Sequence, residues 1–510
     1  FEPRVIERRN LIGRREAYQL VHQPQVMRDA IRARTRLIYD ELMLLQMGLA
    51  IGKRLRDGKL TAPIVRIDKL LDERIRRRFP FELTGAQQRC IWELMHDMKS
   101  GRPMNRLLQG DVGSGKTSVA LYAMLVCVAN KLQSAILAPT EVLAEQHFYN
   151  ISTALAGSNV QVELVSGKTR RTRKGSHLQS IAEGATHIAV GTQALLSGDV
   201  EFANLGLVVV DEQHKLGVRQ RAMFRGKGTS PHYLVMTATP IPRTLALSYF
   251  ADFDLSIVDE LPPGRTPVAT RWLRPEQAAR AHEFVRSEVE QGRQAYIVLP
   301  QIDESGMDDT KGVTAEFKRL SEGPLASLRL GMLHGQLPTD EKQRVMSAFR
   351  AREFDVLVAT TVIEVGVDVP NATEMLIESA ERFGLSQLHQ LRGRVGRGAN
   401  KSHCILISAA QNDDAVERLN AMCRTNDGFE IAEIDMKLRG PGDFLGTRQH
   451  GLPALKIADI TEELELLSDA RDDALSILET DPQLSRPHHA ALRRALLEKF
   501  GDALPLAQIG

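Results

Sequence analysis

The segment from Gly110 to Thr117, which reads GDVGSGKT, constrains the fold of this chain more than any other. It fits the pattern GxxxxGK[ST], follows the apolar pair Leu107 and Leu108, and precedes an apolar run from Ser118 to Val128. A phosphate-binding loop needs this order of strand, loop and helix, because its glycines let backbone N–H groups close around phosphate oxygens at a helix N-terminus. The sequence therefore predicts an α/β domain built around this loop.

Short apolar runs alternate with helical patterns between residues 80 and 410, which predicts parallel sheets built from βαβ units. The expected strands are 134–138, 187–190, 207–210, 233–236, 296–299, 356–359, 375–377 and 404–407. The Pro-Pro-Gly cluster within Glu260 to Thr266 cannot continue a helix or a strand. We therefore expect a linker there, between two tandem α/β lobes with parallel sheets.

The two ends of the chain lack strand signals and read as helical. We expect an N-terminal helical segment at 1–78, a nucleotide-binding lobe at 79–262, a second lobe at 263–410 and a C-terminal helical hairpin and tail at 411–510. A chain of 510 residues exceeds what one hydrophobic core usually serves, which agrees with several domains.

The composition, with 43% hydrophobic and 25% charged residues, is that of an ordinary globular protein. The net charge of +2 does not by itself indicate a nucleic-acid partner. Arginine clusters in the first 80 residues fit either a phosphate-facing surface or a solvated helix face, and both interpretations stay open. The clusters lie at Arg8 and Arg9, Arg14 and Arg15, 32–36 and 74–78.

The four cysteines lie far apart, with no CxxC pair and no histidine at ligand spacing, so the sequence indicates neither a zinc site nor a disulfide framework. No apolar run approaches the length of a membrane span, and no signal peptide is visible. We expect a cytoplasmic protein. The chain opens at Phe1 within basic, helix-like sequence, and we expect a further N-terminal part to precede it.

An acidic pair follows the predicted strand that ends at Val210. The C-terminal ends of parallel strands are where open α/β sheets bind ligands, so Asp211 and Glu212 are expected at the nucleotide. Asp211 and the Thr117 hydroxyl would hold Mg²⁺, and Lys116 would reach the β- and γ-phosphates. Glu212 would orient or deprotonate the attacking water.

The segment from Gln390 to Arg397, which reads QLRGRVGR, supplies positively charged side chains. Arg394 and Arg397 are three residues apart, about one helical turn, so both can point the same way. An arginine from the second lobe would neutralise charge developing on the γ-phosphate only when the lobes close. The three glycines at Gly393, Gly396 and Gly398 indicate close approach to another element.

Small hydroxyl residues follow several predicted strands, in the segments APTE, GTQ and ATT. Hydroxyl and backbone N–H groups can grip a phosphodiester backbone without reading bases, although a helix-capping role fits each segment equally well. As a set they favour a nucleic-acid track across both lobes. The candidate residues for this track are Thr140, Gly191, Thr192 and Thr360. Thr237 and Thr239 of the segment MTATP could couple the nucleotide state to movement of the lobes, although a hydroxyl-rich strand end explains this segment nearly as well.

Read in order, these segments resemble the motif series of superfamily 2 helicases. The series comprises LTGAQ at 83–87, the phosphate-binding loop, APTE, GTQ, DEQH at 211–214, TAT, ATTVIEVGVD at 359–368 and QLRGRVGR. The segments MTATPIPRT, DELPPGRTP and above all 427–451 resemble the RecG family of bacterial ATP-dependent DNA helicases. Among other families, only transcription-repair coupling factors are expected to share the last segment.

The resemblance implies two RecA-like lobes and an ATP- and Mg²⁺-dependent DNA translocase or helicase that remodels branched DNA, by fork reversal or Holliday junction branch migration. It also implies a bacterial, nucleoid-associated monomer, with single-strand-binding protein as a candidate partner. The implied nucleotide contacts are Phe81 (or Phe79), Thr84, Gln87, Gly110, Gly113, Ser114, Gly115, Lys116, Thr117, Gly366 and Asp368. The resemblance also implies that Gln390 acts in hydrolysis beside Arg394 and Arg397. The residues implied in coupling hydrolysis to movement on DNA are Arg418, Arg439 and Gln449.

The chain departs from the family pattern in two places. Lys215 and Leu216 stand where arginine and phenylalanine are expected. No barrel-like run of short strands precedes residue 80, so we expect the N-terminal wedge that splits fork arms to be absent from this chain. Such a protein would hydrolyse ATP and track along duplex DNA while unwinding forks poorly.

Three alternatives remain at the level of sequence. A translocase of the transcription-repair coupling type would need a polymerase-interaction module, which this chain lacks. A branch-binding scaffold with a vestigial nucleotide site disagrees with the presence of Lys116, Thr117, Asp211, Glu212 and Arg397. A P-loop ATPase that does not act on nucleic acid would not explain the second lobe.

Overall fold

A computed structural model gives the fold of the chain. It describes residues 3–57, 60–165, 176–196, 200–212, 230–238, 253–300, 309–361, 369–398, 400–439, 455–459 and 462–501. Two compact units contain these residues: Phe1–Leu60, Ile241–Leu255 and Met436–Gly510 form one, and Thr61–Pro240 with Ser256–Asp435 forms the other.

Within its described residues, the larger unit contains two sheets. The first, which we call lobe 1, has seven described strands in the order β3-β4-β2-β5-β6-β1-β7. All of the strand pairs whose register is described in this sheet are parallel. Its strands are β1 (Asn105–Gly110), β2 (Gln133–Leu137), β3 (Val162–Val165), β4 (Ile188–Gly191), β5 (Leu205–Asp211), β6 (His232–Thr237) and β7 (Asp254–Val258).

Helices flank the lobe 1 sheet: α4 (Lys69–Arg76), α5 (Gly85–Met98), α6 (Lys116–Ala129), α7 (Glu141–Ala154) and α9 (Ser176–Ala182). Strands β2 and β6 are buried along their whole length, as expected of strands covered on both faces. Helix α6 is apolar on nearly every side and is almost entirely buried, which fixes the helix that follows the phosphate-binding loop within the core of the lobe.

The second sheet, lobe 2, has six parallel strands in the order β10-β11-β9-β12-β13-β8. The strands are β8 (Ala269–Leu273), β9 (Gln294–Val298), β10 (Leu330–Leu333), β11 (Val356–Ala359), β12 (Ala372–Ile377) and β13 (His403–Ile407). The accompanying helices are α12 (Ala278–Glu290), α13 (Asp309–Glu322), α14 (Thr339–Arg350), α15 (Leu385–Arg392), α16 (Asp413–Arg424) and α17 (Gly428–Arg439).

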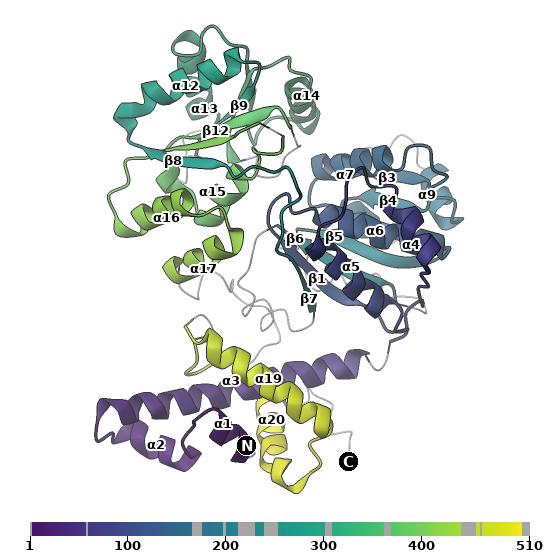
Figure 1. The fold of residues 1–510 in the computed structure, drawn as a ribbon, viewed down its shortest axis with the longest axis vertical. Helices are drawn as coiled ribbons and strands as arrows, with labels where there is room; N and C mark the ends of the chain where they lie inside the picture. The colour runs from purple at the N-terminus through teal and green to yellow at the C-terminus, as the bar shows by residue number, and fades with distance from the viewer. Residues whose placement is uncertain are drawn as a thin grey trace. The chain divides into compact units, whose positions relative to one another are not determined.

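The smaller unit is helical. The helices described in it include α1 (Pro3–Arg8), α2 (Arg14–His22), α3 (Met27–Asp57), α19 (Leu464–Thr480) and α20 (Ala490–Phe500). Helices α3 and α19 lie side by side although they are more than 400 residues apart in the chain (Figure 1). Tyr39 of α3 is fully buried and donates its hydroxyl to Asp473 of α19 at 2.5 Å, so the pairing combines an apolar core with a buried hydrogen bond.

The α/β fold with two parallel-sheet lobes and helical ends is confirmed. Each of the eight predicted strands overlaps an observed one, although β5, β9 and β12 begin two or three residues before the predicted starts at 207, 296 and 375. The predicted linker at 260–266 falls between β7 and β8. The grouping into units differs from the four predicted segments, because the two ends of the chain share one core. Within the described part of the chain, no helix has the length and apolarity that crossing a membrane would require.

Candidate nucleotide-binding and hydrolysis site

The loop between β1 and α6 has the backbone that a phosphate cradle needs. Gly113 and Gly115 have positive φ angles of 75° and 84°, a region that residues with a side chain rarely adopt. A Cβ at Gly115 would also collide with the amide group of Gln87. Gln87 is held in turn by a capping box with Thr84, and its Nε2 donates to the Ser114 carbonyl at 2.8 Å.

The ammonium group of Lys116 lies inside the loop. Its Nζ donates to the carbonyl oxygens of Gly110 at 2.7 Å and Asp111 at 2.9 Å. Burial lowers the pKa of Lys116, and the carboxylates of Glu212, Asp111 and Asp211 oppose that effect. A buried cation faced by three acids is well suited to accept an anionic ligand.

Asp211 ends β5 as predicted and is the more acidic member of the pair. Burial alone would raise its pKa, but a hydrogen bond from His147, the charge of His147 and the charge of Lys116 together hold the pKa below its usual range. His147 Nε2 lies 2.7 Å from Asp211 Oδ2. Asp211 is therefore an ionised carboxylate, the form that binds Mg²⁺.

Glu212 has the opposite property. Burial and the neighbouring charge of Asp211 raise the pKa of Glu212 to about 7, with Lys116 acting against them. Its φ angle of 53° is positive, its N–H donates to the Met236 carbonyl at 3.0 Å, and its Oε1 accepts from the Ala238 N–H at 3.1 Å. A strained backbone and a near-neutral pKa are typical of a catalytic base.

Lobe 2 contributes α15 and the turn after it. Arg397 Nε donates to the Gly393 carbonyl at 3.1 Å, and burial lowers the pKa of Arg397 to about 10, which still leaves it charged at neutral pH. Gly393 explains the predicted close approach, because a Cβ there would lie 2.7 Å from Cγ1 of Val112 in the phosphate-binding loop. Arg394 lies close enough to Glu212 for its charge to lower the pKa of that carboxyl.

One cavity of about 1160 Å³ joins these groups. Its lining includes Gly113, Gly115, Lys116, Thr117, Asp211 and Glu212 from lobe 1 and Gln390, Arg394 and Arg397 from lobe 2. Phe79 and Phe81 also line it, with ring centroids 5.9 Å apart, and Phe81 is 49% exposed. The structure thus brings together the six residues predicted to act in hydrolysis, which are Lys116, Asp211, Glu212, Gln390, Arg394 and Arg397.

Other predicted residues lie outside this lining. Thr140 caps α7 by accepting from the Leu143 N–H, Gly191 ends β4 and Thr192 follows it. The side chains of Thr237 and Thr360 are buried, so they do not offer hydroxyl groups to a strand of nucleic acid. Arg418 donates to the Glu381 carbonyl at 3.0 Å. Arg439 ends α17, and Thr239, Gly366, Asp368 and Gln449 lie outside the described residues.

Sequence reasoning missed three residues at the site. His147 pairs with Asp211, Arg265 of the linker donates to the Val112 carbonyl, and His389 lies 2.6 Å from Asp111. Each is a lone residue whose partner is distant in the chain, so no spacing pattern could indicate it. The only available signal was position: His389 precedes QLRGRVGR, and Arg265 lies in the segment DELPPGRTP.

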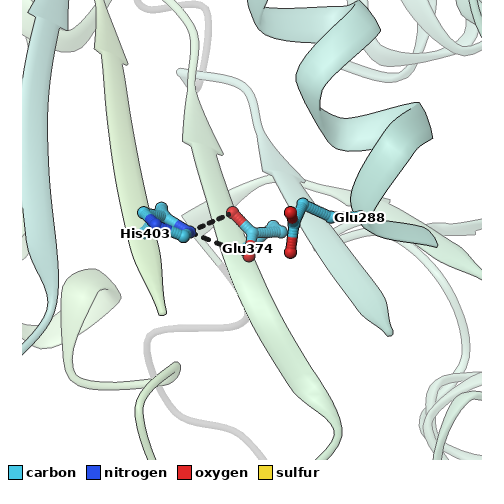
Figure 2. A group of neighbouring side chains, drawn as sticks. All are labelled: Glu288, Glu374 and His403. Carbon is cyan, nitrogen blue, oxygen red and sulfur yellow. Dashed lines mark hydrogen bonds and ion pairs between the residues drawn. The ribbon is translucent and has the colours of Figure 1, made fainter. Parts of the chain in front are cut away.

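A second cluster of charged side chains lies at the N-terminal edge of the lobe 2 sheet, where Glu374 of β12 pairs across the strands with His403 of β13 and Glu288 of α12 adjoins them (Figure 2). Glu288 already contacts Arg293 and Gln291, and both Glu374 oxygens lie 3.2 Å from His403 Nδ1. Protein groups therefore satisfy the acids that a metal ion would need, and the cluster is a buried ion-pair network.

Family profiles match three parts of the chain: DEAD/DEAH box helicase at 84–247, helicase conserved C-terminal domain at 277–399, and ATP-dependent DNA helicase RecG, domain 3, C-terminal, at 425–507. ATP-dependent DNA helicase RecG of Bacillus subtilis (strain 168) is 43% identical over 484 residues, which are 95% of this chain and 71% of the relative. RecG of Synechocystis sp. is 44% identical over 498 residues, 98% of this chain and 60% of the relative.

Solved structures of helicases are also similar to this chain. A structure of RecG bound to a three-way DNA junction has a TM-score of 0.72 and 42% identity, and the match covers 92% of this chain and 61% of that one. The DUF1998 helicase MrfA bound to DNA, at 17% identity and a TM-score of 0.55, shares the fold. This chain thus spans 60% to 71% of the RecG chains named above. On these matches and on the two-lobed nucleotide site, the chain belongs to the RecG family of ATP-dependent DNA helicases.

Proposed function

We propose that this chain hydrolyses ATP in the cavity between its lobes and uses the hydrolysis to move along branched or duplex DNA. The observation that carries the proposal is the joint lining of one cavity by Lys116, Asp211 and Glu212 of lobe 1 and by Arg394 and Arg397 of lobe 2. A site divided in this way completes its set of charges only when both lobes meet.

Each side chain has a role that its environment supports. Lys116 and the N–H groups of the glycine loop bind the β- and γ-phosphates, and Phe81 lies at the cavity wall where an adenine ring could stack. Glu212, with its pKa near 7, takes a proton from the attacking water, while Arg397 balances charge on the γ-phosphate.

The residues present fit Mg²⁺. The ionised carboxylate of Asp211 and the hydroxyl-bearing Thr117 line the same cavity and offer the oxygen ligands that Mg²⁺ prefers. When bound, Mg²⁺ would neutralise phosphate charge. His147 would keep Asp211 ionised and oriented, because its Nε2–H points at the carboxylate.

The proposed substrate is branched DNA, since the RecG of the solved complex is bound to a three-way junction. Thr140, Thr192 and the N–H groups near Gly191 are the proposed phosphodiester contacts in lobe 1, and Arg418 is a proposed coupling residue in lobe 2. These assignments rest on position after the strands and on family membership.

Hydrolysis assays on forked, linear duplex and single-stranded DNA test the proposal. Branched DNA should stimulate ATP hydrolysis by the wild-type chain. Lys116→Ala should lower the rate by about 10³-fold or more, because the phosphates lose their buried cation. DNA binding by the same variant, measured by fluorescence anisotropy, should be largely retained. Turnover that no DNA stimulates would contradict the proposal.

A further inference from the structure

A continuous chain of buried and partly buried hydrogen bonds leaves the phosphate-binding loop and enters lobe 2. Asp111, the second residue of GDVGSGKT, accepts at Oδ1 from His389 of α15, with 2.6 Å between Oδ1 and Nε2. The other ring nitrogen of His389, Nδ1, lies 3.1 Å from Nη2 of Arg392. His389 and Arg392 are 4% and 3% exposed, so solvent has little access to the bond between them, and the Asp111 side chain is 18% exposed.

The partners of His389 determine which nitrogen carries its proton. A guanidinium group has only donors, so Nδ1 must accept from Arg392. Nε2 therefore carries the hydrogen and donates to the Asp111 carboxylate. The imidazole of His389 thus connects the carboxylate of Asp111 to the guanidinium group of Arg392. A 180° flip of the ring would break both contacts.

The far end of the chain is a helix terminus. Nη1 of Arg392 donates to the carbonyl oxygens of Met422 at 2.9 Å and Thr425 at 2.8 Å. Met422 lies in the last turn of α16, and Thr425 is its C-cap residue. The last carbonyls of a helix lack partners within the helix and carry partial negative charge, so a buried arginine there fixes the position of the terminus.

The segment fixed by Arg392 leads directly into α17. Asp427 accepts from the Phe429 N–H at 2.8 Å, and its own N–H donates to the Thr425 hydroxyl at 3.0 Å, so Thr425 also helps to shape the start of α17. The match to the RecG domain 3 profile begins at residue 425. The hydrogen-bond chain thus joins the phosphate-binding loop to the beginning of the part of the sequence that is specific to the family.

Backbone carbonyl groups of the same loop accept hydrogen bonds from cationic side chains. The backbone oxygens of Gly110 and Asp111 accept from Lys116, the residue expected to turn to a phosphate, and the Val112 carbonyl accepts from Arg265. A shift of the loop backbone would therefore act on the Asp111 carboxylate, whose Oδ1 accepts from the Val112 N–H at 2.5 Å and lies 2.6 Å from His389 Nε2.

We propose that His389 is a positioning residue that transmits the state of the phosphate-binding loop to the junction of α16 and α17, through hydrogen bonds to Asp111 and Arg392. The inference rests on the proposed function, because it assumes that the loop binds ATP. It assigns His389 no contact with the reacting atoms.

The chain contains a natural reporter for this movement. Cys423 follows Met422 directly and is exposed, whereas Cys90, Cys127 and Cys404 are buried. The rate at which Cys423 reacts with a maleimide therefore reports on the end of α16. Cys423→Ser, which lies outside the nucleotide cavity, serves as the control that identifies the labelled thiol.

The experiment compares this rate with and without a slowly hydrolysed ATP analogue in the presence of Mg²⁺, at saturation established separately for each variant. His389→Gln keeps a donor toward Asp111 and an acceptor toward Arg392, whereas His389→Phe keeps the volume and removes both. In the wild type and in His389→Gln, nucleotide should change the rate by about fivefold or more, a change of the size typical of linked sites. In His389→Phe the change should shrink to about 1.5-fold or less.

An equal nucleotide effect in His389→Phe, no effect in the wild type, or loss of the effect in His389→Gln would each overturn the inference. The assay contains no DNA. If DNA fails to stimulate hydrolysis while nucleotide still changes the labelling of Cys423 through His389, the proposed function fails and this inference stands.

Discussion

Two of the clusters of acids and bases described in the larger unit differ in what surrounds them. The nucleotide cluster of Lys116, Asp211 and Glu212 opens into a cavity of about 1160 Å³ at the C-terminal ends of the lobe 1 strands. The cluster of Glu288, Glu374 and His403 lies at the N-terminal edge of the lobe 2 sheet, where Arg293 and Gln291 complete its contacts. Burial raises the pKa of an acid in both, Glu212 and Glu374.

The comparison shows that a buried acid with a raised pKa does not by itself indicate a reactive site. In the nucleotide cluster the residues beside the acid face open space that a ligand can fill. In the lobe 2 cluster the neighbouring protein groups already satisfy the acids. The two clusters are distinguished less by burial than by whether a cavity adjoins the acids and by which end of the strands carries them.

Removing the charge that lobe 2 brings to the cavity should have the largest effect. Arg397→Ala should lower kcat for ATP hydrolysis by about 10³-fold, because an arginine at a γ-phosphate contributes on that scale. Arg329→Ala is the matched control, since Arg329 pairs with Asp355 on the exposed surface of lobe 2. Steady-state kinetics with and without DNA measure the effect. If both variants hydrolyse ATP at similar rates, Arg397 does not act at the phosphate.

Neutralising the acid of the nucleotide cluster should have the next largest effect. Glu212→Gln keeps the acceptor for the Ala238 N–H but cannot take a proton, so kcat should fall by about 10²-fold or more while nucleotide still binds. Binding of a fluorescent ATP analogue separates the two properties. A kcat within a few-fold of the wild type would transfer the role of base to another group.

The dependence of the hydrolysis rate on pH tests the role of Glu212 as the base. Because burial raises the pKa of Glu212 to about 7, the fraction of ionised base increases through neutral pH. The rate at saturating ATP should therefore increase by about tenfold from pH 6 to pH 8, and Glu212→Gln should flatten this part of the profile. A profile that is equally steep in the variant would assign the titration to a different residue.

The motifs of the nucleotide cluster could be predicted from sequence because each is contiguous and follows a strand, so the topology of a parallel sheet brings them to one edge. Strand β8, which reads ATRWL and is half exposed, lacked the continuous apolar run that predicted β9 and β11. His147, Arg265 and His389 could not be predicted, because their partners lie 64, 153 and 278 residues away. Such pairs depend on how the elements pack, which a single sequence does not reveal.

The smallest effect on activity is expected in the lobe 2 cluster. Glu374→Gln should leave ATP hydrolysis within about twofold of the wild type, since Glu374 is buried in its ion-pair network and lies outside the cavity lining. Its effect should appear in stability instead. The folded-state pKa of Glu374 is raised, first by burial and also by Glu288, so its ionisation costs more in the folded than in the unfolded chain.

The sign of that effect follows from linkage. A carboxyl group with a raised folded-state pKa contributes its full stability below the unfolded pKa and loses it as pH increases through the folded pKa. Glutamine does not titrate, so the Tm of Glu374→Gln relative to the wild type should increase between pH 4.5 and pH 7. Thermal unfolding at several pH values measures this difference. A relative Tm that decreases with pH would mean that the ion pair with His403 outweighs burial, and Glu374 would then stabilise the fold as an ionised group.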